Sequence, residues 1–269
     1  MNKQSKFNQI SKDIKTIKIQ GARNIAKAGL KAYKLIPTKT SKNKLLSLRP
    51  TEPLLANILK NAEKLTLKQL NQKLKENQEK INKQVLKLIK NNSVVFTHCH
   101  SSTVVNALIY AKKKGKKFEV YNTETRPLYQ GRKTARELKK AKIKVTMFVD
   151  SAVGIALTKS QKTKNVDLIL LGADAILKKG AINKVGSGMI AQLAKLNKIP
   201  LYIVADSWKY FPKNIKIEQR DFDEVWNTIR KIKIKNPAFE FIPKKLIKGI
   251  ISELGTLSYL EFLKKVQRQ

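Results

Sequence analysis

Residues 93–122 read SVVFTHCHSSTVVNALIYAKKKGKKFEVYN, and this stretch decides the fold. An apolar run at 93–97 is followed by a helical pattern at 101–114 and then by a second apolar run at 118–122. Short apolar runs that flank a helix are typical of parallel strands, which are buried on both faces and joined by a crossover helix. The stretch therefore predicts a parallel sheet that is covered by helices.

The same alternation continues toward the C-terminus. Further strands are predicted at 144–149, 167–172 and 200–205, with helices at 132–142, 151–158 and 186–197. Strands and helices that alternate over such a length predict the α/β class, with a mostly parallel sheet. We therefore expect one α/β domain at 93–269.

The chain before residue 93 has a different character, and we predict a helical N-terminal domain at 1–92. Apolar residues between 67 and 90 recur at helical spacing, and Thr66 with Gln69 forms a capping-box pattern at the start of this segment. The remaining predictions for this domain are a helix at 3–17 and loops at 37–44 and 49–53.

The formal net charge is +38, from 57 lysines and arginines against 19 aspartates and glutamates. A charge of this size attracts nucleic acids and other polyanions. The basic residues are spread along the whole chain, however, and no zinc spacing, aromatic RNP motif or basic heptad region accompanies them. We therefore favour a compositional origin of the charge, and nucleic-acid binding stays open as the alternative.

Three further features narrow the class of protein. No apolar run approaches the length of a membrane-spanning helix. Residues 1–20 are polar and lack the apolar core of a secretory signal. The single cysteine excludes an internal disulfide bond and fits a reducing compartment. We therefore expect a cytoplasmic protein without a membrane partner.

Polar residues follow every predicted strand. Parallel sheets bind ligands beyond the carboxyl ends of their strands, so these residues should converge on one rim. They are His98–His100, Thr123–Arg126, Asp150 with Ser151, Gly172–Asp174, and Ala205–Ser207. The pattern predicts one site that contains a thiol, carboxylates and an arginine.

Cys99 lies just before the helix predicted to start at 101. A helix N-terminus lowers the pKa of a nearby thiol, which makes Cys99 a candidate base or nucleophile. The alternative is a small buried core cysteine. His98 and His100 alternate in direction, so at most one is expected to face the site. A metal is disfavoured, because this triplet cannot close a tetrahedral zinc site without further ligands, of which Asp174 could supply one.

Three segments are candidate phosphate-binding elements. QGARN at 20–24 places a glycine and Arg23 before a helix, and Arg49 lies in a loop with two prolines. The third segment, INKVGSG at 182–188, combines a lysine with two glycines at a helix start. Together they indicate a substrate with more than one phosphate. GSG is not the dinucleotide fingerprint and we expect no strand directly before it, so no NAD is predicted.

These motifs together resemble a known superfamily. The matching segments are GARNIA, LRPTEP, THCHSSTV, ETRPLYQGRKTAREL, VDSAVG, LGADAILKKGAINKVGSGMIA, VADSWKYFP and NPAFEFIP. They span 20–245 in order and resemble the sugar-phosphate isomerases related to the regulatory subunits of translation initiation factor two B. THCHS and RPTEPLLANIL look most like the archaeal ribose-1,5-bisphosphate isomerases.

The resemblance implies a helical N-terminal domain and a Rossmann-like catalytic domain. It implies an aldose–ketose isomerase that converts ribose 1,5-bisphosphate to ribulose 1,5-bisphosphate in AMP breakdown. It also implies a homo-oligomer, a dimer or a hexamer, with AMP as an activator and with no cofactor. The catalytic cysteine of the family falls on Cys99, which we expect to be the base, and its aspartate falls on Asp174, the expected acid. Substrate contacts fall on Gly21, Ala22, Arg23, Arg49, Ser101, Asn183, Lys184 and Lys209.

The sequence departs from the family pattern at two places. Ser102 stands where some of these isomerases have a lysine, and the region between 37 and 66 is shorter than in typical members.

Two alternative functions stay open. One alternative is methylthioribose-1-phosphate isomerase, which shares the cysteine and the aspartate. The other is a non-catalytic regulatory subunit that binds initiation factor two; such subunits usually lack this pair, whereas Cys99 and Asp174 are both present here.

Overall fold

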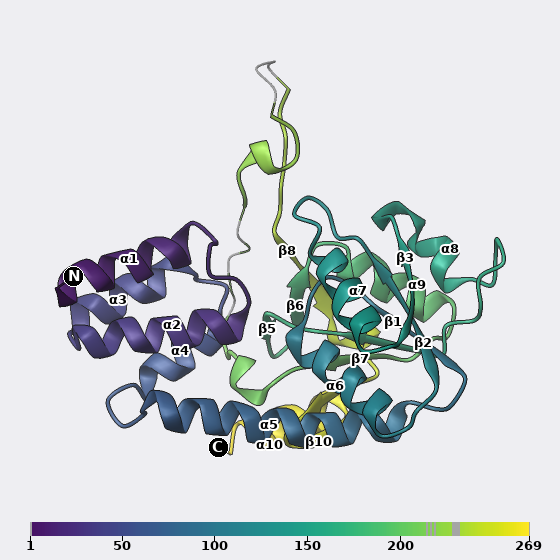
Figure 1. Cartoon of the computed structure of the whole chain (residues 1–269), viewed down its shortest axis with the longest axis horizontal. Coiled ribbons are helices and arrows are strands. Elements are labelled where there is room, and N and C mark those ends of the chain that lie inside the picture. The colour runs from purple at the N-terminus through teal and green to yellow at the C-terminus, as the bar shows by residue number, and fades with distance from the viewer. Residues whose placement is uncertain (1, 214, 216, 218, 228–231, 269) are drawn as a thin grey trace.

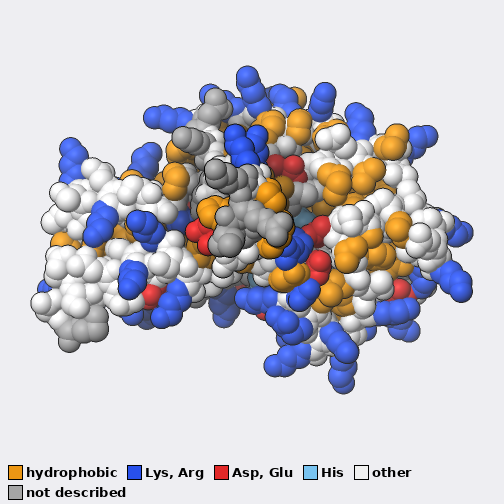
Figure 2. Space-filling view, turned by 90° about the horizontal axis from the view of Figure 1, so that it is seen from above, with side chains coloured by type: hydrophobic (Ala, Val, Ile, Leu, Met, Phe, Trp, Pro, Cys, Tyr) orange, Lys and Arg blue, Asp and Glu red, His pale blue; other side chains and the backbone are white. Residues whose placement is uncertain are grey.

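The computed structural model describes residues 2–213, 215, 217, 219–227 and 232–268. A group of helices from the N-terminal third lies at one end of the molecule, and a helix-covered sheet lies at the other (Figure 1). None of the described helices is long and apolar enough to cross a membrane. On the face shown in Figure 2, lysine and arginine side chains are scattered over both parts and do not gather in one patch.

Four helices pack around the apolar cluster of the N-terminal part. They are α1 (Lys3–Lys15), α2 (Ala22–Leu35), α3 (Lys39–Leu48) and α4 (Pro53–Lys60). Helix α3 shows that the loop expected at 37–44 is wrong. Its N-cap Thr38 accepts a hydrogen bond from the Ser41 amide at 3.1 Å, and Leu45 is fully buried. Only two residues of α3 are buried, so the helix has almost no apolar periodicity in the sequence.

Helix α5 (Leu67–Leu88) belongs to both parts of the molecule. The capping box of Thr66 and Gln69 is present at its start, as predicted. Leu70 and Leu74 pack in the cluster of the N-terminal helices, whereas Ile81 and Val85 pack against the sheet. Figure 1 shows α5 running beneath both parts.

A seven-stranded sheet forms the centre of the second part. Its strands, in spatial order, are β10 (Gly255–Leu257), β9 (Gly249–Ser252), β7 (Leu201–Val204), β4 (Leu168–Leu171), β1 (Ser93–Thr97), β2 (Phe118–Thr123) and β3 (Lys144–Phe148). All neighbours are parallel except β9 and β10. The five predicted strands are confirmed, with ends shifted by at most one residue, and the α/β class is confirmed with them.

Helices cover both faces of this sheet. One face carries α5, α6 (Ser102–Lys113) and α7 (Gln130–Lys140), and the other carries α8 (Val153–Leu157), α9 (Ser187–Leu196) and α10 (Tyr259–Val266). Each face has its own apolar cluster, because side chains alternate between the two faces along a strand. The resulting three layers leave the carboxyl ends of the strands as the free rim of the sheet.

A second, antiparallel sheet was not predicted. It consists of β5 (Ala175–Ile176), β6 (Gly180–Lys184) and β8 (Phe239–Pro243). Strand β6 directly precedes the VGSG turn, so the expectation that no strand stands there is wrong. The register pairs Asn183 with Glu240 and Lys184 with Phe239, which fixes where this polar end of β6 lies. The short turn Phe222–Glu224, between β7 and β8, lies away from the body of the molecule (Figure 1).

Candidate active site

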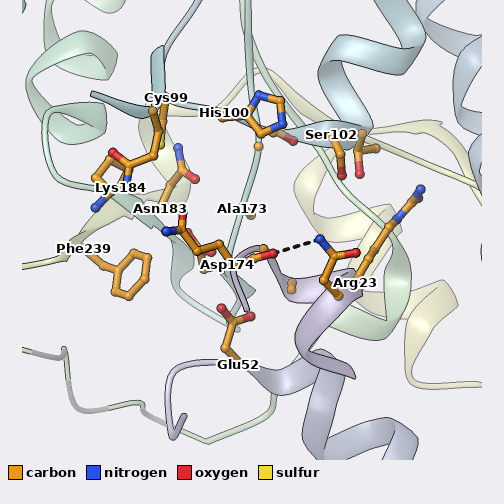
Figure 3. Close-up of a pocket in the computed structure, with 18 of the residues that line it drawn as sticks. Arg23, Glu52, Cys99, His100, Ser102, Ala173, Asp174, Asn183, Lys184 and Phe239 are labelled. Carbon is orange, nitrogen blue, oxygen red and sulfur yellow. Dashed lines mark hydrogen bonds between the residues drawn. The ribbon is translucent and has the colours of Figure 1, made fainter. Parts of the chain in front are cut away.

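One cavity of about 340 Å³ collects all ten residues that the sequence singled out, from Gly21 to Lys209. The N-termini of α2 and α6, the ends of β1, β4 and β6, and the turn after β7 converge on it. The volume suits a small polar ligand. Figure 3 shows Asp174 near the middle, with Cys99 and Lys184 on one side and Arg23 on the other.

The thiol of Cys99 is a weaker acid than the sequence suggested. Burial raises the pKa of Cys99 to about 11, and the charge of Lys184, which favours the thiolate, offsets this only in part. Asp174 and Asp150 add smaller contributions that raise the pKa further. The expectation of a low thiol pKa at the start of α6 is therefore wrong, because burial disfavours the thiolate more than the nearby positive charge favours it.

Asp174 lies in the same buried environment. Burial raises the pKa of Asp174, and the positive charges of Lys209, Lys184 and Arg49 oppose this without cancelling it. The Lys209 ammonium donates a hydrogen bond to the carbonyl oxygen of the neighbouring Ala173. A raised pKa lets a carboxyl group keep its proton to higher pH, which suits Asp174 to donate a proton.

The N-terminus of α2 has the features of an anion site. Gly21 is the N-cap with φ +83°, and among the described residues no side chain caps this end of the helix. Within the described structure, Nε and Nη2 of Arg23 are buried without a hydrogen-bond partner. Burial lowers the pKa of Arg23, while Asp206 and Glu253 raise it. Unpaired amide and guanidinium donors beside a helix N-terminus are suited to hold a phosphate.

The N-terminus of α6 approaches the cavity because Gly172 leaves room for it. Ser101 caps this helix and accepts a hydrogen bond from the Val104 amide at 3.4 Å. A Cβ atom on Gly172 would lie 2.7 Å from both the Cβ and the Oγ of Ser101. A side chain at position 172 would therefore push the end of α6 away from the end of β4.

Both histidines of the THCHSS motif line the cavity, so the expectation that only one of them faces it is wrong. Cys99, which lies between them, has φ +63°, and this turn ends the alternation of an extended strand. His98 is buried, with Nδ1 2.5 Å from the Thr123 hydroxyl and Nε2 2.8 Å from the Val185 carbonyl oxygen. Burial lowers the pKa of His98 and of His100, which keeps both rings neutral near pH 7.

Several residues that line the cavity were missed. Arg49 forms a buried ion pair with Glu52 at 3.6 Å, and the acid could have been suspected from its place in the same proline loop. Lys27 follows Arg23 at one helical turn, which is a weak but readable signal. Gln130, Lys133 and Phe239 lie in segments that match the superfamily but were not singled out, and no local signal marked Asn106 or Arg220.

No metal cluster accompanies these groups in the part of the chain that the structure describes. Nowhere in that part do three or more histidine, cysteine, aspartate or glutamate side chains gather around one point. The thiol of Cys99 and the carboxyl group of Asp174 offer proton transfer, beside several cationic groups that can hold anions.

Residues 18–259 match the model of the Initiation factor 2 subunit family, and the chain belongs to this family. It is 34% identical to the ribose 1,5-bisphosphate isomerase of Methanocaldococcus jannaschii, over 91% of this chain and 89% of that protein. It is also 33% identical to the methylthioribose-1-phosphate isomerase of Exiguobacterium sibiricum, over 80% of this chain and 71% of that protein.

The fold agrees with this membership. It is similar to the crystal structure of the Pyrococcus horikoshii translation initiation factor eIF-2B, with a TM-score of 0.83 and 25% sequence identity. The alignment covers 94% of this chain and 96% of that one. The helical N-terminal part and the α/β part that the resemblance implied are thus both present.

Proposed function

We propose that this protein is an aldose–ketose isomerase that converts ribose 1,5-bisphosphate to ribulose 1,5-bisphosphate. The observation that carries the proposal is the joint placement of Cys99 and Asp174 in a cavity with cationic groups on both sides of them. The names of the archaeal relatives that match most of the chain support the same substrate.

The proposed reaction moves one proton from C2 to C1 of the sugar. The Cys99 thiolate removes the C2 proton while the bond between C1 and the ring oxygen breaks, and Asp174 gives its proton to that oxygen. The electron pair of the C2–H bond becomes the C1–C2 double bond of an enol. Return of a proton to C1 and loss of the C2 hydroxyl proton leave a ketone at C2. An acid and a base placed in this way each contribute about 10²- to 10⁴-fold in rate.

Cationic groups and helix termini would bind the two phosphates. We assign one phosphate to Gly21, Ala22 and Arg23 at the start of α2, where the donors of Arg23 are unpaired among the described residues. The other substrate contacts are proposed to be Arg49, Ser101, Asn183, Lys184 and Lys209.

The missing lysine at position 102 has substitutes nearby. Ser102 lines the cavity together with Lys27 and Lys133, whose ammonium groups can supply the charge from α2 and α7. Lys133→Met should therefore raise the KM for the bisphosphate more than Ser102→Ala does. An unchanged KM in Lys133→Met would remove Lys133 from the proposed set of contacts.

Methylthioribose-1-phosphate isomerase is the second candidate, because one of the relatives carries that activity in its name. Its substrate has one phosphate and an apolar methylthio group. The described lining is dominated by charged and polar side chains, and its apolar side chains are Ile17, Ala22, Ala173 and Phe239. This composition favours the bisphosphate. A purely regulatory role is disfavoured by the presence of both proton-transfer groups.

The proposal extends to the location, the oligomeric state, the regulation and the domain division of the protein. We propose a cytoplasmic homo-oligomer, a dimer or a hexamer, which AMP activates. We also propose a division of the chain into an N-terminal domain at 1–92 and a catalytic domain at 93–269, with α5 contributing to both cores.

The test is turnover of the two sugar phosphates side by side, by the wild type, Cys99→Ser and Asp174→Asn. Formation of ribulose 1,5-bisphosphate by the wild type, with large losses in both variants, is the expected result. Preferential turnover of methylthioribose 1-phosphate would move the assignment to the second candidate. An inactive wild type, or full activity in both variants, would refute the isomerase proposal.

A further inference from the structure

Two threonine hydroxyls bond the backbone of Cys99, one on each side. Oγ1 of Thr125, at the end of β2, accepts a hydrogen bond from the Cys99 amide at 3.0 Å. Oγ1 of Thr134, on α7, donates a hydrogen bond to the Cys99 carbonyl oxygen at 2.8 Å. Both threonines are buried, with exposed fractions of 0% and 1%. Thr125 lies in the segment Thr123–Arg126 that the sequence placed at the rim of the sheet, whereas Thr134 was not singled out.

This pair of bonds acts on a residue in an unfavourable conformation. Cys99 has φ +63°, the left-handed region that residues with a Cβ atom rarely adopt. Such a conformation persists only where the surroundings hold it in place, and it is concentrated at functional sites. The two hydroxyls fix the peptide groups before and after the Cys99 Cα atom, and therefore fix the direction of the thiol.

Both threonines are themselves held by neighbouring groups. The Thr134 hydroxyl has one proton and donates it to the Cys99 carbonyl oxygen. Toward Nδ1 of His100, at 3.1 Å, the same hydroxyl is therefore the acceptor. The amide of Thr125 donates to Asp150 Oδ1 at 2.9 Å, at the end of β3. Hydrogen bonds therefore connect Cys99, which follows β1, directly to α7 and, through Thr125, to the segments that follow β2 and β3.

The direction of the thiol decides which charges it meets. In the present conformation Lys184 from β6 faces it and favours the thiolate, while Asp174 after β4 and Asp150 after β3 disfavour it. Figure 3 shows Cys99 on the same side of the cavity as Lys184, with His100 beside it. A Cys99 that relaxed to an extended conformation would change the direction of its side chain and so leave this arrangement.

We propose that Thr134, together with Thr125, is a positioning residue that holds the Cys99 thiol in the cavity beside Lys184 and Asp174. The effect on turnover rests on the proposed isomerase function, whereas the effect on the thiol does not. The two can therefore be tested separately.

The first experiment titrates the thiol without substrate. Cys99 is the only cysteine, so the rate of alkylation by iodoacetamide between pH 7 and pH 10.5 reports this one group. In Thr134→Val the thiol leaves the buried cavity, its pKa falls toward the ordinary value of about 8.5, and alkylation at pH 8 becomes at least about tenfold faster. Thr134→Ser keeps the hydroxyl and should restore the wild-type profile.

Thr97→Val is the matched control. Thr97 is buried on β1, and its hydroxyl also donates to a backbone carbonyl at 2.8 Å, that of Leu170, but it does not touch Cys99. The control should alkylate like the wild type even though it loses an equivalent bond. An unchanged profile in Thr134→Val, or the same change in Thr97→Val, would overturn the proposal. If Thr134→Val does not fold, Thr125→Val removes the other bond and is judged by the same criteria.

The second experiment measures turnover in the same variants. Thr134→Val should lower kcat by about 10- to 100-fold, with little change in KM, because a displaced base affects the transition state more than the binding of phosphates. Altered alkylation together with an inactive wild type would leave the positioning role standing and refute the isomerase. Altered alkylation with an unchanged kcat would overturn the catalytic part of the positioning role.

Discussion

Nε2 of His98 donates a hydrogen bond to the carbonyl oxygen of Val185 at 2.8 Å and so ties the end of β1 to the turn before α9. Nδ1 of the same ring accepts from the Thr123 hydroxyl on β2. Gly186 makes this approach possible, since a Cβ atom there would lie 3.1 Å from the imidazole ring. One buried ring therefore connects the two sheets next to Lys184.

His98→Leu should destabilise the protein because it removes the partner of the buried Thr123 hydroxyl and of the half-buried Val185 carbonyl oxygen. We expect a loss of about 2–4 kcal/mol in the free energy of unfolding, measured by urea denaturation. Thr123→Val removes only one of the two bonds and should lose less. Wild-type stability in His98→Leu would show that the two hydrogen bonds contribute nothing to the fold.

The reactivity of Cys99 should depend steeply on pH. Only the thiolate is alkylated, so with a pKa of about 11 the rate in the wild type should still be rising between pH 8 and pH 10. Lys184 favours the thiolate, so Lys184→Met should raise the thiol pKa and slow alkylation at pH 9. A rate that levels off below pH 9 in the wild type, or faster alkylation in Lys184→Met, would contradict this electrostatic account.

Arg23→Gln should weaken phosphate binding at the N-terminus of α2. The guanidinium is largely buried and has unpaired donors within the described structure, so its loss should raise the KM of the bisphosphate by roughly tenfold or more. Inorganic phosphate should inhibit the variant less strongly than it inhibits the wild type. Arg136→Gln, an exposed arginine on α7 outside the cavity lining, is the control and should keep the wild-type KM. Equal KM values in the two variants would show that Arg23 does not bind a phosphate of the substrate.

Gly172→Ala should displace the start of α6. The added methyl group would meet Ser101 at 2.7 Å, and overpacking of this kind costs about 1–3 kcal/mol. We expect lower thermal stability and lower kcat/KM, because Ser101 and the preceding Cys99 must shift. Gly154→Ala is the control, since a methyl group there meets no atom within 4 Å among the described residues. Similar behaviour of the two variants would argue against a packing role for Gly172.

The central sheet could be predicted because its inner strands are apolar on both faces. Strands β1, β2, β4 and β7 consist mostly of buried residues, which give continuous apolar runs in the sequence. The second sheet could not be predicted in the same way. Strand β5 has two residues, and β6 reads GAINK, which carries no strand periodicity although all five residues are buried.

The location of the candidate site was predictable for a topological reason, whereas its electrostatics were not. Parallel strands present their carboxyl ends on one rim, so Cys99 and Asp174 had to lie near each other once their strands were identified. The pKa of Cys99 depends on burial in three dimensions, which a helix start in the sequence does not report. Thr134 was missed for the same reason, since it is 35 residues away from the carbonyl that it bonds.

Helix α5 couples the two parts of the molecule, because it contributes side chains to the apolar cluster of each part. Leu70 and Leu74 cannot leave their cluster without disturbing the same continuous helix that presents Ile81 and Val85 to the sheet. Unfolding of either half would expose apolar surface of the other half to water. The chain should therefore show one calorimetric transition. The walls of the cavity come from both halves, and a ligand held between them would therefore raise the melting temperature of the whole chain.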